Sequence, residues 1–333
     1  MNSNIFQWEI ESAAACARIK QNRSPLKIVL KIKDDSFFLQ SWIDHHSKIV
    51  GLENLIILDN MSDDPKVVEV YAKVADLVCV IRFTGFHNRV HRVEDFELLY
   101  RALQHSSEYF QFLDADEKLV YVDNDLNVFN DNSIVDALLD SNASVLPGSW
   151  LENVSGSESY LWWDLKQNHP FSCLRSGKPI IASRINVTGM LNHNHHLAEN
   201  LYDKDVKTNF LVLHYKRLSA KQRIDSNFRK LLAYNAFKGR PTTFEDVLVF
   251  NWQEMPPGNK RNWVKEIQSL SNQAPSPIEP SRLRDGMVEL RDGRLRFSSE
   301  DQRSMFIAML HHPVSHVEQA LGQRAIVPEP DAD

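Results

Sequence analysis

Short apolar runs that alternate with amphipathic stretches dominate the first third of the chain. Branched and aromatic side chains crowd into four such runs, at 26–32, 55–58, 77–83 and 109–113. Continuous apolar runs of this length are typical of parallel strands covered on both faces, and the stretches between them carry apolar residues at helical spacing. Strands that alternate with helices form right-handed β-α-β units. The sequence therefore predicts an α/β fold with a mostly parallel sheet flanked by helices.

Aspartate residues stand at the ends of three of these runs. Asp34 follows the first run, Asp59 the second and Asp114 the fourth. The carboxyl ends of parallel strands meet at one edge of the sheet, and ligands bind at that edge in such folds. We therefore expect the three side chains to converge there.

The fourth run leads into the segment FQFLDADEKLV at 110–120, where Asp114, Asp116 and Glu117 fall within four positions. Like charges this close repel one another, and a divalent cation such as Mg²⁺ or Mn²⁺ is the usual relief. An isolated Asp-x-Asp triplet is more often a solvated acidic turn. The convergence with the other strand ends is what favours a metal site here.

The composition excludes several other classes of protein. A net charge of −6 argues against a general nucleic-acid binder. The three cysteines are too scattered for a disulfide framework or a zinc site, so we expect a reducing, cytoplasmic location. The sequence has no signal-peptide pattern, no run long enough to span a membrane and no glycine-rich dinucleotide or P-loop motif.

Changes in composition divide the chain into three predicted parts. We expect an N-terminal lead-in at 1–25, a catalytic-type domain at 26–240 and a C-terminal accessory region at 241–333. The accessory region contains a proline-rich linker at 271–280 and a hairpin at 287–297, where an Asp-Gly dipeptide fits a type I′ turn.

Four motifs, in order, resemble those of one enzyme family. DDSFFLQSWIDHH at 34–46 and IILDNMSDD at 56–64 are similar to the opening segments of glycosyltransferases related to families 2 and 92. FQFLDADEKLV resembles the metal motif of these enzymes, and LHYKRLS at 213–219 resembles their closing element. The resemblance covers roughly residues 26–235. It implies a GT-A (Rossmann-like) fold, a nucleotide-sugar donor, with a UDP-sugar favoured, and Mn²⁺ or Mg²⁺ bridging the diphosphate.

The resemblance also implies roles for four residues: Asp59 for the nucleotide, Asp114 and Asp116 for the ribose and the metal, and His214 for the metal. We further expect Asp34, at the first strand end, to contact the nucleotide and Glu117 to support the acidic turn.

The leaving diphosphate and the acceptor hydroxyl call for two further groups. Lys216 and Arg217 follow a predicted strand and are candidate phosphate contacts, with a solvated basic turn as the alternative. An inverting transfer needs a general base, and Glu152, Glu158 and Asp164 lie in the loop-rich segment where the acceptor should bind. Nothing in the sequence chooses among these three, and Glu152 is carried forward as the candidate.

Histidine and tryptophan residues offer further, less specific candidates. His193 and His195 could ligate a metal or contact phosphate, although histidines in a polar loop are more often only hydrogen-bonded. His46 falls on an apolar helix face and is expected in the core. Trp162 and Trp163 fit an acceptor-sugar platform and the core equally well.

The favoured function is a metal-dependent, inverting glycosyltransferase that moves a sugar to a glycan or glycolipid acceptor in polysaccharide biosynthesis, with peripheral membrane association left open. Departures from the family pattern at Gln40, Ser41 and Lys118 motivate a second hypothesis, a catalytically silent nucleotide- or glycan-binding relative. A metal-dependent phosphohydrolase is a third, weakened because no second carboxylate-rich motif supplies a two-metal site.

Overall fold

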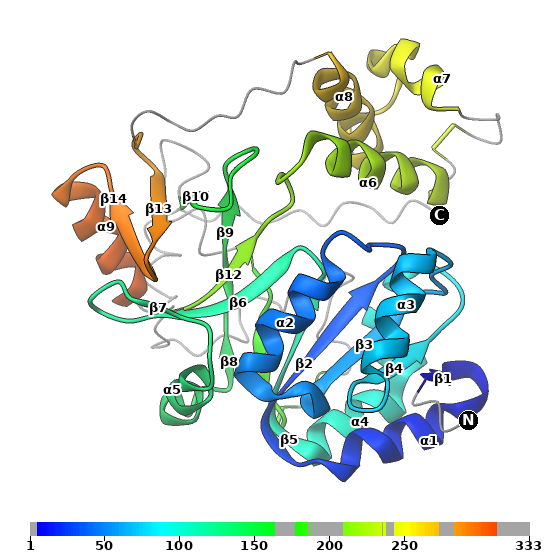
Figure 1. Ribbon diagram of the computed structural model, residues 1–333, viewed down its shortest axis with the longest axis vertical. Coiled ribbons are helices and arrows are strands. Elements are labelled where there is room, and N and C mark those ends of the chain that lie inside the picture. The colour runs from blue at the N-terminus through cyan, green and yellow to red at the C-terminus, as the bar shows by residue number, and fades with distance from the viewer. Residues whose placement is uncertain are drawn as a thin grey trace.

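The computed structural model describes residues 5–163, 177–185, 187, 209–234, 236–237, 243–272 and 283–311. These residues form a mixed α/β fold with two seven-stranded sheets flanked by helices (Figure 1). No helix among them is long and apolar enough to cross a bilayer.

The first sheet has the strand order β1-β4-β3-β2-β5-β11-β8. Its first five members pair in parallel, which confirms the four strands predicted from the apolar runs. β11 pairs antiparallel with both β5 and β8. The strands are β1 (Ile5–Gln7), β4 (Cys79–Arg82), β3 (Leu55–Asp59), β2 (Ser24–Ile32), β5 (Ser107–Asp114), β11 (Ile180–Ala182) and β8 (Val145–Leu146).

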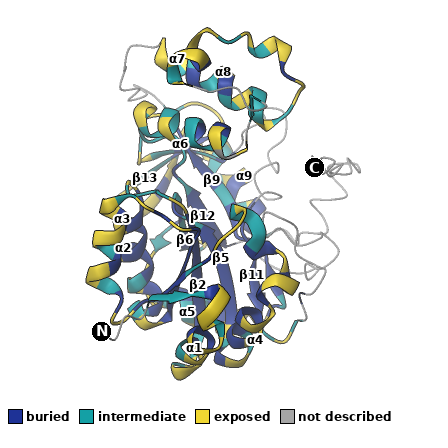
Figure 2. Cartoon of the chain, turned by 90° about the vertical axis from the view of Figure 1, so that its right-hand side faces the viewer, coloured by how far each residue is buried: buried dark blue, intermediate teal, exposed yellow. Residues whose placement is uncertain are grey.

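Helices cover both faces of this sheet, as the continuous apolar runs require. Along β2, Ile28 and Leu30 belong to one apolar cluster and Val29 to another, because successive strand residues point to opposite faces. The first cluster includes residues of α2 (Leu39–Val50) and α3 (Pro65–Val74). The second includes residues of α1 (Trp8–Gln21) and α4 (Glu97–Ser106). Figure 2 shows the resulting buried centre between exposed helix faces.

The second sheet has the order β14-β13-β10-β9-β12-β6-β7 and is mostly antiparallel, with β9 and β12 parallel. Its strand β6 starts immediately after the acidic turn that ends β5, so this turn joins the two sheets. The strands are β14 (Arg294–Phe297), β13 (Met287–Arg291), β10 (Tyr160–Trp162), β9 (Ser149–Asn153), β12 (Phe210–His214), β6 (Glu117–Val122) and β7 (Val128–Phe129). Helix α5 (Ser133–Ser141) contacts α2, and α9 (Glu300–His311) contacts β14.

Three helices form a small lobe with its own apolar core. They are α6 (Ala220–Ala233), α7 (Phe244–Val249) and α8 (Asn259–Ser271), with a 3-10 turn at Trp252–Glu254. Leu231, Val247 and Val264 lie at the centre of that core. In Figure 1, α6 lies across the carboxyl ends of the parallel strands.

Segments near both ends of the chain contribute strands to the two sheets. β1 pairs with β4, so the segment expected as a lead-in contributes an edge strand and α1 to the first sheet. The hairpin β13–β14 joins the second sheet through β10. Positive φ angles at Asp292 and Gly293, 54° and 70°, agree with the expected type I′ turn. Most of the predicted linker at 271–280 lies outside the described residues.

Two histidines on α2 contact β6, the strand that follows the acidic turn. His46 is fully buried; its Nδ1 lies 2.9 Å from the Trp42 carbonyl oxygen, and its Nε2 accepts from the Leu119 N–H at 3.2 Å. This confirms the prediction of a core histidine. His45 Nε2 lies 2.7 Å from the Leu119 carbonyl oxygen. Burial lowers the pKa of His45 to about 4.

We expect this burial to make the fold sensitive to acid. The ordinary His45 pKa of 6.5 applies to the unfolded chain, so between pH 6.5 and about 4 the unfolded state binds more protons than the folded state. Stability must then fall as the pH falls through this window, by about 2 kcal/mol at about pH 5 for His45 alone. Urea unfolding of wild type and His45→Gln, which keeps a donor for Leu119, measures the difference. An equal acid loss in the two proteins would contradict it, and His105→Gln on exposed α4 surface is the control.

Candidate functional site

The carboxyl ends of β2, β3 and β5 lie side by side in the first sheet, and in Figure 1 helix α6 lies above them. The acidic residues at or just after the ends of β2 and β5, Asp35, Asp114 and Asp116, are called the rim. Asp114 is the last residue of β5 and is the most heavily paired member of this rim. Its Oδ2 lies 2.8 Å from Lys178 Nζ, and its Oδ1 lies 3.5 Å from Lys31 Nζ. Burial alone would raise the pKa of Asp114, but Lys178 and Lys31 hold this pKa well below its usual range. Asp114 is therefore a carboxylate already neutralised by two ammonium groups.

The Glu117 side chain hydrogen-bonds the backbone of the acidic turn at Asp114. Its Oε2 accepts a 2.7 Å hydrogen bond from the Asp114 backbone N–H, and its Oε1 accepts one of 2.7 Å from the Trp150 indole. Lys178 Nζ lies 3.9 Å away. The side chain is fully buried, and this burial raises the pKa of Glu117 to about 7. These contacts fix the turn's conformation and keep Glu117 away from solvent.

Asp116 points toward His214, the last residue of β12. His214 Nε2 lies 3.5 Å from Asp116 Oδ2, and the Tyr215 N–H donates to the Asp116 carbonyl oxygen at 2.7 Å. Although burial opposes ionisation, His214 lowers the pKa of Asp116. Trp150 packs against the His214 ring with 4.9 Å between centroids, and His214 Nδ1 is buried without a hydrogen-bond partner. Two side chains predicted as metal ligands are thus brought together.

The two aspartates after β2 have different surroundings. Asp34, at a positive φ of 49°, accepts the backbone N–H groups of Asp63 and Asp64 at 2.8 and 3.1 Å, so its Oδ1 ties two loops together. Asp35 belongs to the rim instead. Burial and the neighbouring Asp116 raise the pKa of Asp35 to about 6, and its Oδ1 is buried without a partner.

Helix α6 brings positive charge over these carboxylates. Arg229 and Lys230 both act electrostatically on Asp35, opposing its raised pKa. Burial lowers the pKa of Lys230, whereas Asp116, Asp114 and Asp35 raise it. Helix α6 therefore lies close enough for Arg229 and Lys230 to interact with the rim.

Asp59 lies beneath the rim and is fully buried. Its Oδ2 lies 3.0 Å from Arg82 Nε, and both carboxylate oxygens accept the Ser62 N–H at 3.1 Å. Arg82 also donates to the Ser62 carbonyl oxygen at 2.6 Å. The carboxylate predicted to contact the nucleotide is thus engaged in holding the loop after β3.

Glu152 and Lys216, predicted as general base and phosphate contact, are paired with each other. Glu152 is only 7% exposed, and Arg217 Nη1 lies 3.7 Å from its second oxygen. Arg217 also reaches Glu266 of α8 at 3.7 Å. In the parallel register of β9 and β12, Glu152 lies opposite His214. These residues thus form an ion-pair network beside the rim.

Other predicted candidates fall elsewhere. Glu158 is exposed, and Trp163 is buried against Phe306 with 5.9 Å between ring centroids, so it is a core residue. Trp162, half-buried, pairs with Glu152 in the β10–β9 register. Asp164, His193 and His195 lie outside the described residues.

Lys178 is a site residue that the sequence did not indicate. Its N–H donates to the Gly148 carbonyl oxygen at 3.0 Å, and its carbonyl accepts from Gln111 Nε2 at 2.7 Å. A Cβ on Gly148, at a φ of +54°, would lie 2.0 Å from the Lys178 carbonyl oxygen, and one on Gly177 would lie 2.2 Å from the Gly148 carbonyl oxygen. Only glycines permit this backbone crossing, which delivers the buried ammonium group to Asp114. The segments Pro-Gly at 147–148 and Gly-Lys-Pro at 177–179 are the signal in the sequence.

The donor set for a divalent cation is smaller than predicted. The described residues contain no cluster of three histidine, cysteine or acidic side chains that could hold a metal. Asp116 and His214 supply one carboxylate and one imidazole, and the unpartnered His214 Nδ1 leaves this ring with hydrogen-bonding capacity to spare. Mn²⁺ accepts such a pair when substrate oxygens complete its coordination. These two residues therefore fit a metal, whereas Asp114 is occupied by its two lysines.

No protein-family model matches this chain, and neither does any curated protein. Among solved structures, it is similar to the mannosyltransferase PcManGT from Pyrobaculum calidifontis in complex with GDP-Man and Mn²⁺, at 12% identity and a TM-score of 0.36, over 79% of this chain and 77% of that one. S. aureus TarS 1-349 in complex with UDP matches at 9% identity and a TM-score of 0.34, over 83% and 97%. GalNAc-T7 with UDP, GalNAc and Mn²⁺ matches at 12% and 0.35, over 75% and 55%. TM-scores this low carry no conclusion about this chain's activity.

Proposed function

We propose that the protein is a glycosyltransferase that takes a sugar from a nucleotide-sugar donor and passes it to a saccharide acceptor. One observation supports this most: the rim carboxylates Asp35, Asp114 and Asp116 all interact electrostatically with Lys230 of α6, the helix that lies above the carboxyl ends of the strands in Figure 1. Carboxylates on one side and cations on the other suit a ligand with both hydroxyl groups and phosphates. The order of the four family-like motifs along the chain agrees with this reading.

The contacts of each site residue indicate which part of the donor it would bind. Asp35, with its unpartnered buried oxygen, takes the nucleotide-contacting role expected for Asp34, because Asp34 is engaged by two backbone N–H groups. Arg229 and Lys230 are placed to offset the negative charge that develops on a leaving diphosphate. Asp116 and His214 would hold Mn²⁺ or Mg²⁺, which when bound supplies further stabilisation of that charge.

The ion pair between Glu152 and Lys216 favours one alternative. A general base must be free to accept a proton from the acceptor, and Glu152 is held by two cations. A relative that binds the nucleotide sugar without transferring the sugar is therefore the second candidate. The two differ in whether bound donor is consumed.

Calorimetry with a panel of nucleoside diphosphates and nucleotide sugars tests the proposal. We expect one donor to bind the wild-type protein in the micromolar range, about −8 kcal/mol, with Mn²⁺ present, and to be hydrolysed slowly without acceptor. Binding without hydrolysis would favour the silent relative. If no nucleotide or nucleotide sugar binds with either Mn²⁺ or Mg²⁺, the proposed function is wrong.

A further inference from the structure

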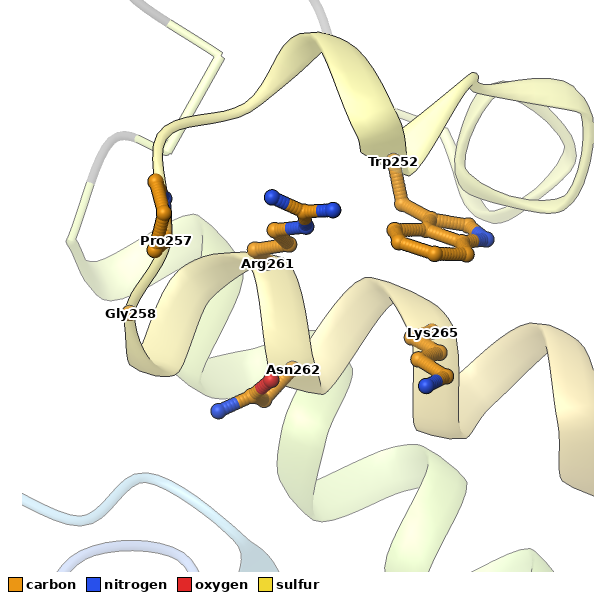
Figure 3. Close-up of a pocket in the computed structure, with 6 residues that line it drawn as sticks. All are labelled: Trp252, Pro257, Gly258, Arg261, Asn262 and Lys265. Carbon is orange, nitrogen blue, oxygen red and sulfur yellow. The ribbon is translucent and has the colours of Figure 1, made fainter.

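A pocket of about 390 Å³ opens on the helical lobe, between the 3-10 turn that follows α7 and the start of α8 (Figure 3). Small-molecule sites commonly have volumes of roughly 300–1,000 Å³, so this pocket can accept a monosaccharide-sized ligand. None of its residues belongs to the rim site. They are Trp252, Pro257, Gly258, Arg261, Asn262 and Lys265.

Two cations in this pocket are held by an aromatic ring. The guanidinium carbon of Arg261 lies 4.8 Å from the centroid of the Trp252 ring, and Lys265 Nζ lies 5.2 Å from it. A cation–π contact engages the face of the ring and leaves N–H donors of the cation available. Figure 3 shows the Arg261 guanidinium pointing into the space between Pro257 and Trp252.

Neither cation has a carboxylate partner among the residues that the structure describes. By contrast, Glu266 on α8 does have cationic partners. Arg217 lies 3.7 Å from it and Arg223 lies 2.8 Å from it. Arg261 and Lys265 stand four residues apart on α8, where like charges repel. A bound anion would remove the repulsion between these two charges.

The chemistry of the lining specifies the ligand. A guanidinium fork matches the paired oxygens of a phosphate or a carboxylate, and lysine adds a point charge. Asn262 offers a side-chain amide to the hydroxyl groups of a sugar, beside the two cations. We propose that this pocket binds a saccharide carrying a phosphate or carboxylate group. This binding does not rest on the proposed function, because none of the lining residues belongs to the rim site.

Direct binding of simple probes tests the pocket without any enzymatic assay. We expect glucose 6-phosphate and glucuronate to bind the full chain with dissociation constants of about 1 mM, and uncharged glucose to bind at least about tenfold more weakly. Arg261→Gln should weaken binding of the charged sugars at least about fivefold, because glutamine keeps polarity but loses the charge. Lys48→Gln, an exposed lysine on α2, should bind like wild type.

Three results would overturn the site. They are equal binding of glucose and the charged sugars, unchanged binding by Arg261→Gln, or no binding of either charged sugar by wild type. Inorganic phosphate competing as strongly as glucose 6-phosphate would overturn the saccharide part. Asp116→Asn should leave this binding intact, so loss of donor binding and loss of pocket binding are separate outcomes. If the pocket binds charged sugars and no donor binds at all, the saccharide site stands and the proposed function fails.

Discussion

Replacing Asp116 with asparagine is expected to weaken Mn²⁺-dependent donor binding by about 100-fold, equivalent to about 2.7 kcal/mol, with little change in stability. The substitution keeps the shape of the side chain and removes the negative charge that lies 3.5 Å from His214 Nε2. Its backbone carbonyl still accepts the Tyr215 N–H, so the turn keeps that anchor. Calorimetric titration of the donor with and without Mn²⁺ measures the loss.

The control for this variant is Asp63→Asn. Asp63 lies in the loop after β3, is exposed, and interacts with Asp34 only through its backbone N–H. The Asp63→Asn substitution removes one negative charge from this loop and should leave the dissociation constant of the donor within about twofold of wild type. If Asp63→Asn weakens binding as much as Asp116→Asn, the effect is general electrostatics and Asp116 has no special role. If Asp116→Asn unfolds the protein, the acidic turn is structural.

The parallel core was predictable because its signals are local. Each of the four apolar runs overlaps one strand of the parallel sheet, although the ends differ by up to two residues. A strand that is buried on both faces needs apolar side chains at successive positions, so the pattern is visible without knowing how the strands pair. The edge strand at Ile5–Gln7 was missed since three half-buried residues carry too short a pattern. The hairpin's turn was predicted correctly because a type I′ turn needs positive φ at two adjacent residues, and an Asp-Gly dipeptide is one of the few that adopt such angles readily.

The site was harder to predict because pairing between distant strands decides it. Asp116 and His214 meet because β6 and β12 pair antiparallel with Glu117 opposite His214, a register set by the sheet and not by local sequence. The parallel register of β9 and β12 likewise brings Glu152 to the strand that leads to Lys216. The sequence predicted Glu152 as a general base and Lys216 as a phosphate contact, and gave no sign that the two side chains form an ion pair.

We expect Lys178→Met to lower the free energy of unfolding by about 2–3 kcal/mol, less than the loss for a fully buried pair, because Asp114 is 36% exposed and keeps Lys31 at 3.5 Å. The Lys178 side chain is 5% exposed and lies 2.8 Å from Asp114 and 3.9 Å from the fully buried Glu117. Burial opposes the charge on Lys178, but these carboxylates raise its pKa. Methionine fills a similar volume, so the loss reports the charge and not a cavity. Urea denaturation at neutral pH measures it.

The double variant Lys178→Met with Asp114→Asn separates electrostatics from packing. Removing both members of a buried pair often costs far less than removing one, so the double variant should recover at least about 1.5 kcal/mol relative to the sum of the single losses. Lys221→Met is the matched control, since Lys221 pairs with Asp225 while 84% exposed and should change stability by less than about 1 kcal/mol. Additive losses in the double variant would mean that the lysine holds the Gly148–Gly177 crossing and not the acidic turn. A recovered double variant that also binds donor would show that Asp114 shapes the rim without touching the ligand, leaving Asp116 and His214 as the groups that do.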